Sequence, residues 1–350
     1  MTDSIHEQLA PVLGAIEILG PTAFRFAGGP PVQFPDGPPP AQLPGHPYHP
    51  LSDNALVRAI QGVLYRRCYS HPFDPAGGPP YDDFAQPQAD LVDRLAAANA
   101  GREGWDRGWR VYHAGPTGDV SLVKGDRQRV ATPGEYVLEG EPFRRPAVGS
   151  EVSVRTVPDS RTLQPGFYFT FGETPADMWD EYHTIRYYVN AKPEATVALV
   201  RHLTAQLNRY QVAFKMKALS VPAWYTRSDS LVLYVARRDH AIVGRIIGHA
   251  PRSVVAGLAP DTPLFTKRLC PGVGAAEDPR TGESFGMNRC RLVAEGVADA
   301  WAKNLQAVSA RARAVIKRFA ANDLDIERPY LQSRGTVDLF EPIRYATEGP

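Results

Sequence analysis

The sequence lacks the features that mark several large classes of protein. Its 350 residues carry 39 lysines and arginines against 38 aspartates and glutamates, so no strong overall charge attracts nucleic acid or a membrane surface. No apolar run approaches the roughly 20 residues that span a bilayer, and the first residues lack the basic and apolar regions of a secretory signal. We therefore expect a cytoplasmic protein with neither a nucleic-acid nor a membrane partner.

Motifs for common kinds of catalysis are also missing. The three cysteines, Cys68, Cys270 and Cys290, have no zinc-like spacing, which indicates reduced thiols. The histidines form no HExxH pattern, and the chain has no GxxxxGK[ST], GxGxxG or GxSxG segment. The sequence therefore gives little support to a metal enzyme, a nucleotide-binding protein or a serine hydrolase, and no cofactor is expected.

Strand and helix patterns alternate along much of the chain. Proline and glycine over 28–50 predict an extended arm. The predicted fold class is α+β, with a mixed or antiparallel sheet and flanking helices beside a smaller N-terminal helix-and-strand region. The expected domains are residues 1–155, with a docking role for a peptide or partner, and residues 156–350. Strand patterns cover 167–170, 185–189, 214–219, 230–235; helices are predicted over 83–98, 193–210, 240–249, 293–322.

Two lysines stand inside an apolar strand pattern. Phe214, Met216 and Ala218 alternate with Lys215 and Lys217, so both lysines project from the face opposite the apolar side chains. Cations held on a strand suit a compact anion such as phosphate, and a partly dehydrated lysine among cations can act as an uncharged base. The alternative is a solvated edge strand, where lysine discourages pairing with another chain.

Other basic residues lie beside apolar or glycine-containing segments. If residues 287–292 form a strand, Arg289 and Arg291 share a face suited to bidentate anion binding. The alternatives are an ordinary surface loop around Lys267, and a surface strand whose arginines form salt bridges. Acidic candidates for those salt bridges are Glu283, Asp278 and Asp229.

Several segments resemble the HopA-type effector family, most strongly over 182–300. The segments are 64–69, 214–217, 225–229, 263–267 and 283–286. Members of that family occur in bacterial pathways that modify ribosomally made peptides, notably class V lanthipeptides and thioamide-containing peptides, together with a separate phosphotransferase-like kinase. The resemblance implies a precursor peptide as substrate and a kinase as partner.

The sequence is also similar, more distantly, to phosphothreonine lyases. Those enzymes carry a Lys-x-Lys strand, then an arginine, then a Leu-Tyr strand, and Lys215-Met216-Lys217, Arg227 and Leu233-Tyr234 follow the same order. The similarity implies that Lys217 removes the α-proton. It implies that Arg227 binds phosphate and that Arg289 or Arg291 corresponds to a later anion-binding arginine. The full set of candidate phosphate-binding residues is Lys215, Arg186, Arg227, Tyr234, Lys267, Arg289 and Arg291.

The general acid departs from the lyase pattern. The Lys-Phe-His segment of those enzymes reads Arg186-Tyr187-Tyr188 here, with tyrosine in place of histidine. Tyr188 or His183 is the candidate acid, unless phosphate leaves without protonation.

The predicted reaction is β-elimination of phosphate from phosphoserine or phosphothreonine in a precursor peptide, giving dehydroalanine or dehydrobutyrine in lanthipeptide-like biosynthesis. It requires a positioned base and stabilisation of developing negative charge. Two alternatives stay open. One is a non-catalytic peptide-binding or scaffold subunit of a kinase-containing complex, and the other is a cyclase that adds cysteine thiols to dehydrated residues.

Overall fold

A seven-stranded antiparallel sheet forms the centre of the molecule. The computed structural model describes residues 5–37, 52–77, 82, 84–140 and 145–346. Each neighbouring pair of strands in this sheet runs antiparallel, so the predicted α+β class is confirmed. In spatial order the strands are β14 (Lys267–Cys270), β15 (Val273–Glu277), β11 (Thr184–Val189), β13 (Leu231–Ala236), β12 (Phe214–Leu219), β10 (Phe167–Phe171) and β9 (Asp159–Ser160).

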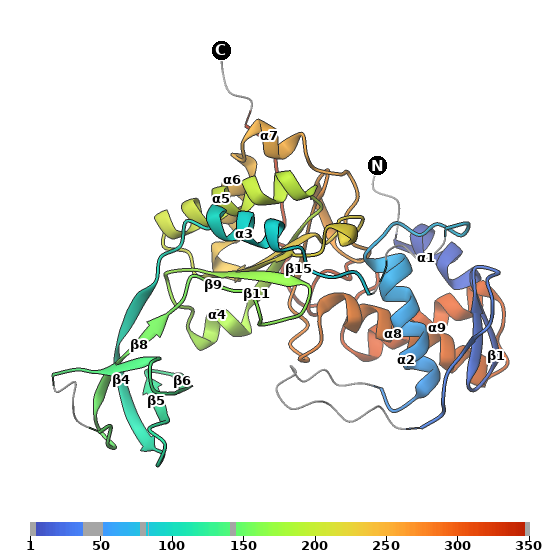
Figure 1. Cartoon of the computed structure of the whole chain (residues 1–350). Helices are drawn as coiled ribbons and strands as arrows, with labels where there is room; N and C mark the ends of the chain where they lie inside the picture. Colours follow the sequence, from blue (N-terminus) through green and yellow to red (C-terminus); the bar gives the residue numbers. More distant parts are fainter. Residues whose placement is uncertain (1–4, 38–51, 78–81, 83, 141–144, 347–350) are drawn as a thin grey trace.

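Helices cover one face of this sheet. Figure 1 shows them above the strands: α3 (Ala89–Ala98), α5 (Pro193–Arg209), α6 (His240–Gly248) and α7 (Arg252–Val255). In α5, which corresponds to the helix predicted over 193–210, Leu199, Leu203 and Leu207 are buried at four-residue spacing. Phe214 and Met216 of β12 belong to the same core. The side chains that alternate with them therefore project from the opposite face of the sheet.

A second sheet, at the lower left of Figure 1, has a small core of its own. Trp109, Leu122 and Val154 are among the buried side chains of this core. In spatial order these strands are β6 (Arg127–Ala131), β5 (Val120–Lys124), β4 (Gly104–Ala114), β8 (Glu151–Thr156) and β7 (Tyr136–Leu138).

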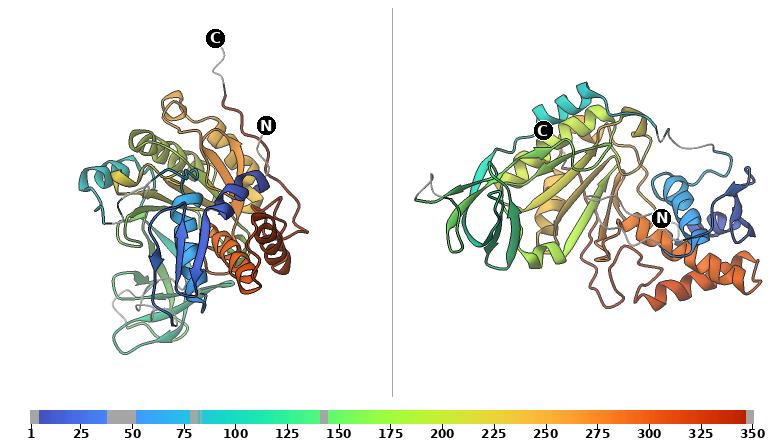
Figure 2. Two further views of the ribbon diagram at one scale, coloured as in Figure 1. Left: turned by 90° about the vertical axis from the view of Figure 1, so that its right-hand side faces the viewer. Right: turned by 60° about the horizontal axis from the view of Figure 1, so that its bottom comes forward.

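Segments from the two ends of the sequence pack together on the side of the large sheet that is farther from the second sheet. Figures 1 and 2 show α1 and α2 in blue beside α8 and α9 in orange and red. Arg311 in α9 donates from Nη1 to the Leu13 carbonyl of α1 at 2.9 Å. The elements of this part are α1 (Ile5–Gly14), β1 (Ile16–Gly20), β2 (Ala23–Phe26), β3 (Val32–Gln33), α2 (Ala55–Leu64), the π-helix η1 (Tyr65–Tyr69), α8 (Phe285–Ala302) and α9 (Val308–Ala321).

Short helical turns complete the fold: α4 (Met178–Tyr182), η2 (Pro222–Trp224) and η3 (Arg237–Asp239). Among the described helices, none is both long and apolar enough to cross a bilayer. Residues 38–50 of the predicted proline-rich arm lie outside the described residues. The division of the chain at residue 155 stays a prediction.

Gly296 allows α8 and α9 to approach closely. A Cβ atom at this position would lie 2.6 Å from Val315 Cα and 2.8 Å from the Val315 nitrogen. We expect Gly296→Ala to lower the free energy of unfolding by about 1–3 kcal/mol because the two backbones must move apart. Urea denaturation measures this change. Gly62→Ala in α2 is the matched control, since a Cβ there meets no atom within 4 Å and alanine favours a helix. Equal losses in both variants would contradict the steric explanation.

Candidate functional site

A tyrosine lies between two cations on the sheet face opposite α5. The strand register places Tyr234 of β13 opposite Arg186 of β11 on one side and opposite Lys215 of β12 on the other. The ring centroid of Tyr234 is 5.3 Å from Arg186 Cζ and 4.9 Å from Lys215 Nζ. At these distances both cations interact with the aromatic ring. We call these three residues the Arg–Tyr–Lys row.

The expected base lies in the adjacent row of the same face. There the register places Val232 opposite Tyr188 of β11 and opposite Lys217 of β12. Because side chains two residues apart on a strand share a face, Lys217 is next to Lys215 and diagonal to Tyr234. The structure therefore brings together Lys215, Lys217, Arg186, Tyr188 and Tyr234, all of which the sequence placed in the site.

The charges around Tyr234 alter its acidity. Burial opposes ionisation of the hydroxyl, but the positive charges of Lys217, Arg186 and Lys215 outweigh burial and hold the pKa of Tyr234 below its usual value of 10. Tyr188 shows the opposite effect, since burial raises its pKa well above 10. The two tyrosines of this face thus differ in how readily they release a proton.

Lys217 lies in the interior of the sheet, beside an aromatic wall. Strand β12 is bonded to β13 and to β10, so the alternative of a lysine-bearing edge strand is wrong. Lys217 Nζ donates to Gln164 Oε1 at 3.2 Å and lies 4.2 Å from the ring centroid of Phe167. Phe169, directly opposite Lys217 on β10, extends this apolar surface. Lys217 is partly buried, whereas Lys215 is exposed.

Arg227 is bound by a carboxylate next to this site. It donates from Nε to Asp229 Oδ1 at 2.7 Å and from Nη2 to Asp229 Oδ2 at 2.8 Å, and both residues are buried. Burial alone would raise the pKa of Asp229, but Arg227 lowers it, with further contributions from Lys217 and His71. The Arg227–Asp229 pair is therefore within the electric field of Lys217. Phosphate binding by Arg227 stays a prediction.

Arg289 and Arg291 do not lie on a strand, so that expectation is wrong. Both belong to α8, which begins where the Ser284 hydroxyl accepts a hydrogen bond from the Met287 amide at 3.3 Å. Successive helical residues point in different directions, so the two arginines cannot share a face as strand residues do. Their spacing of two residues in the sequence wrongly favoured a strand with both arginines on one face.

The two arginines also have separate partners. Arg289 is almost fully buried and donates to the carbonyls of Pro329 and Leu331 at 2.7 and 3.0 Å; burial lowers its pKa to about 10. Arg291 pairs with Glu283 at 2.8 Å, so the salt-bridge alternative is right for Arg291, although on a helix. A phosphate-binding role for these arginines stays a prediction without geometric support.

Lys267 and His183 lie outside the two rows. The register places Lys267 opposite Ala275, which is itself opposite Tyr187, so Lys267 belongs to the other face of the sheet. Its Nζ bonds to Asp338 at 2.7 Å. His183 follows α4, where its Nδ1 is 2.9 Å from the Trp179 carbonyl. Their expected roles in phosphate binding and proton donation stay predictions.

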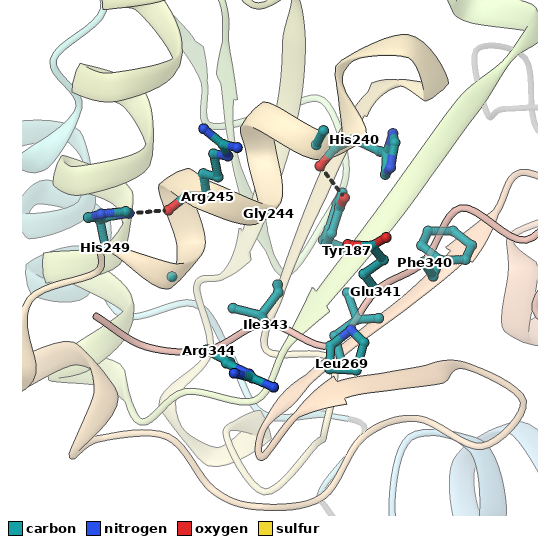
Figure 3. Close-up of a pocket in the computed structure, with 13 residues that line it drawn as sticks. Tyr187, His240, Gly244, Arg245, His249, Leu269, Phe340, Glu341, Ile343 and Arg344 are labelled. Atoms are coloured by element: carbon teal, nitrogen blue, oxygen red, sulfur yellow. Dashed lines mark hydrogen bonds between the residues drawn. The ribbon is translucent and has the colours of Figure 1, made fainter. Parts of the chain in front are cut away.

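Two cavities lie beside the large sheet. One, of about 430 Å³, is lined by all three members of the Arg–Tyr–Lys row and by Phe171, Asp180 and Asp278. Another, of about 280 Å³, is shown in Figure 3. It contains Tyr187, whose hydroxyl donates to the His240 carbonyl at 3.1 Å, together with residues of α6 and of the C-terminal segment. None of the residues expected to bind phosphate lines this second cavity.

Several residues around the site were not predicted. Gln164 and Phe167 contact Lys217, and Asp229 was considered only as a possible salt-bridge partner. His71, from a distant part of the sequence, lies beside Thr226: its Nε2 is 3.2 Å from the Thr226 hydroxyl and its Nδ1 is 3.0 Å from the Arg66 carbonyl. Burial lowers the pKa of His71. The close spacing of Arg227 and Asp229 was the one local signal for these contacts.

The described residues contain no group of three or more histidine, cysteine, aspartate or glutamate side chains placed to hold a metal ion. The positive charges that act on Tyr234 come from Lys215, Lys217 and Arg186. The fold and this group define an α+β protein that places three basic side chains around a tyrosine on one face of an antiparallel sheet.

Residues 158–331 match the HopA1 effector protein family, which confirms the resemblance to HopA-type effectors. The solved structure of an effector protein from Pseudomonas syringae pv. tomato strain DC3000 is similar, with 16% sequence identity and a TM-score of 0.42 over 81% of this chain and 92% of that chain. An effector protein from Pseudomonas syringae pv. syringae strain 61 has 16% identity and a TM-score of 0.42 over 78% of this chain and 89% of that one. No match was found among curated protein sequences.

Proposed function

We propose that this protein is a phosphopeptide lyase, which eliminates phosphate from phosphoserine or phosphothreonine in a peptide and leaves dehydroalanine or dehydrobutyrine. The observation that carries the proposal is the placement of Arg186 and Lys215 on either side of Tyr234, with Lys217 diagonal to that tyrosine. A phosphate dianion is attracted to such a group, and its bound position would bring the neighbouring α-carbon toward the lysine side chains.

The residues divide the chemical work between them. Lys217, as the uncharged amine, takes the α-proton, and the partly buried position beside Phe167 and Phe169 limits its access to water. Lys215 is exposed and lines the 430 Å³ cavity, so it can pair with the phosphate. Positive charge near the reacting carbon also stabilises the negative charge that develops when the α-proton leaves.

Arg186 has a more limited role than the sequence implied. Its Nε donates to Asp278 Oδ2 at 2.8 Å and the side chain is buried, so part of its charge is already neutralised. It still contributes to the field at Tyr234. We infer that Arg186 holds the tyrosine in place and that Lys215 makes the principal contact with phosphate.

The biological setting remains part of the proposal. A lyase of this kind needs a phosphorylated substrate, so a kinase must act first on the same precursor peptide. We propose a separate kinase partner and a place in ribosomal peptide biosynthesis of the lanthipeptide type, in the cytoplasm. The support for this setting is the family match together with the site chemistry.

A non-catalytic peptide-binding subunit is the second candidate. The observation in its favour is that Arg227, Arg291 and Lys267 each have a carboxylate partner. These ion pairs reduce the positive charge available to phosphate, and a binding subunit would require no base. The cyclase alternative has no comparable observation in its favour.

Mass spectrometry of a synthetic phosphoserine peptide incubated with the purified protein tests the proposal. We expect the peptide to lose the mass of phosphoric acid, because elimination releases phosphate without adding water. Loss of the mass of metaphosphoric acid alone would indicate hydrolysis by a phosphatase. A retained complex with an unchanged peptide mass would overturn the lyase and favour the binding subunit. The unphosphorylated peptide is the control and should stay unchanged.

A further inference from the structure

Tyr234 combines three properties of a proton donor. It lines the 430 Å³ cavity together with Lys215 and Arg186. Its hydroxyl forms no hydrogen bond with another residue in the part of the chain that the structure describes, so the hydroxyl can turn toward a bound molecule. Two cations hold its ring from opposite sides of the row, which restricts the ring and orients the hydroxyl.

We propose that Tyr234 is the general acid of the site and protonates the bridging oxygen of the departing phosphate. This inference rests on the elimination reaction proposed above. It assigns to Tyr234 a proton transfer that goes beyond the phosphate contact expected of it from the sequence.

The proton inventory of the step is balanced. Lys217 takes the α-proton, the electron pair of the Cα–H bond forms the Cα=Cβ double bond, and the Cβ–O bond breaks. The proton of Tyr234 passes to the bridging oxygen, so a phosphomonoester dianion leaves as hydrogen phosphate. Lys217 is then an ammonium and Tyr234 a phenolate, and transfer of one proton from the lysine to the tyrosine through water restores both. No other reactant is consumed.

The sheet places the two groups for this exchange. Lys217 and Tyr234 are diagonal neighbours on adjacent strands, a separation that long side chains can span. As the reaction proceeds, positive charge appears on Lys217 while negative charge appears on Tyr234, and the two new charges attract one another. The same cations that lower the pKa of Tyr234 also stabilise its phenolate.

Tyr188 is a weaker candidate for the acid. It is almost fully buried, its ring packs against Tyr69 and Phe285 with centroids 6.4 and 6.2 Å away, and its hydroxyl interacts with Tyr69 and Arg186. Burial raises its pKa, so proton release costs more there than at Tyr234. Tyr188 instead packs its ring against η1 and α8.

The pH dependence follows from the groups that face Tyr234. An acid must be protonated to act, so turnover should fall as pH rises through the pKa of Tyr234, which lies below 10. The acidic groups nearby oppose this ionisation, and the basic groups favour it. The titratable and charged groups around Tyr234 are Lys215 and Lys217 of β12, Arg186 and Tyr188 of β11, Asp278 after β15, and Asp180 and Glu181 of α4.

Tyr234→Phe tests the inference. We expect turnover of a phosphoserine peptide to fall by about 10²–10⁴-fold, as for loss of a general acid, with the affinity for the phosphopeptide largely kept. The alkaline fall in the pH–rate profile should disappear. Tyr187→Phe is the matched control, because Tyr187 is on the opposite face of the same sheet, and it should keep both the rate and the profile. Unchanged turnover in Tyr234→Phe would overturn the inference.

A change of leaving group separates proton donation from phosphate binding. S-phosphocysteine releases thiophosphate, which needs less assistance from an acid than phosphate does. We expect the loss caused by Tyr234→Phe to be much smaller with an S-phosphocysteine peptide than with a phosphoserine peptide. Equal losses with both peptides would make Tyr234 a phosphate-binding residue only.

Two further outcomes keep this inference distinct from the proposed function. If the unaltered protein eliminates phosphate and Tyr188→Phe, rather than Tyr234→Phe, removes the alkaline fall, the acid is Tyr188 and the inference is overturned. If the unaltered protein eliminates from neither peptide, the lyase itself is overturned, and the inference falls with it. An ultraviolet titration gives a readout without substrate: one tyrosine should ionise below pH 10, and Tyr234→Phe should remove that transition.

Discussion

Replacing Lys217 with alanine should abolish elimination from a phosphoserine peptide while phosphopeptide binding persists. Lys217 is the partly buried lysine of β12 and lies diagonal to Tyr234, so its loss removes the base but leaves Lys215 to pair with phosphate. General-base catalysis contributes about 10²–10⁴-fold to a rate, and we expect a loss at the upper end of this range because the α-proton is weakly acidic. Mass spectrometry measures turnover, and calorimetry measures binding.

The control for this variant is Lys317→Ala, which removes an exposed lysine of α9 and should leave both quantities unchanged. Normal turnover by Lys217→Ala would remove Lys217 from the mechanism. Loss of turnover together with an equal loss of phosphopeptide binding would show that Lys217 acts as an anion ligand instead of a base.

Replacing Asp229 with alanine should cause the largest loss of stability. Asp229 and Arg227 are both buried and joined by two hydrogen bonds. The substitution leaves the charge of Arg227 buried without this carboxylate, and breaking a buried ion pair costs about 3–5 kcal/mol. Urea denaturation measures the change in the free energy of unfolding.

Two controls separate this effect from an ordinary loss of charge. Asp93 forms a salt bridge with Arg161 in which both side chains are largely exposed, so Asp93→Ala should cost at most about 1 kcal/mol. The double variant Arg227→Met with Asp229→Leu should be less destabilised than Asp229→Ala, because no unpaired charge remains. Similar losses in Asp93→Ala and Asp229→Ala would contradict the importance of burial.

The same ion pair predicts a change in acid stability. Arg227 holds the pKa of Asp229 below its value in the unfolded chain, which is about 3.9. The stabilisation is therefore fully present above that pH and decreases as pH falls toward the lower pKa of the folded state. In the double variant, this part of the acid-induced loss of stability should be absent.

Much of the sheet could be predicted from local patterns. The alternation of Phe214 and Met216 with Lys215 and Lys217 identified both the strand and the face that carries the lysines, because a strand directs successive side chains to opposite sides. The leucines of α5 were equally informative, since a helix buries residues at a period near four. In each case the signal lies within one element.

The arginines of α8 show where a local pattern was misread. Arg289 and Arg291 fit either a strand or a helix over so short a segment, and the strand interpretation followed from their spacing alone. Ser284, whose side chain begins the helix, was a signal for the correct element, because serine is a preferred residue at helix starts.

The sequence by itself determined that Lys215 and Lys217 share one side of a strand, and that Arg186 and Tyr188 share one side of another. Only the tertiary structure decided that these sides are the same face of one sheet, with Tyr234 between them, because strand pairing joins segments that are far apart in the chain. It also decided which cations are already paired. Asp278 and Asp338 reach their basic partners, Arg186 and Lys267, through the fold, and the charge that remains for a substrate depends on those contacts.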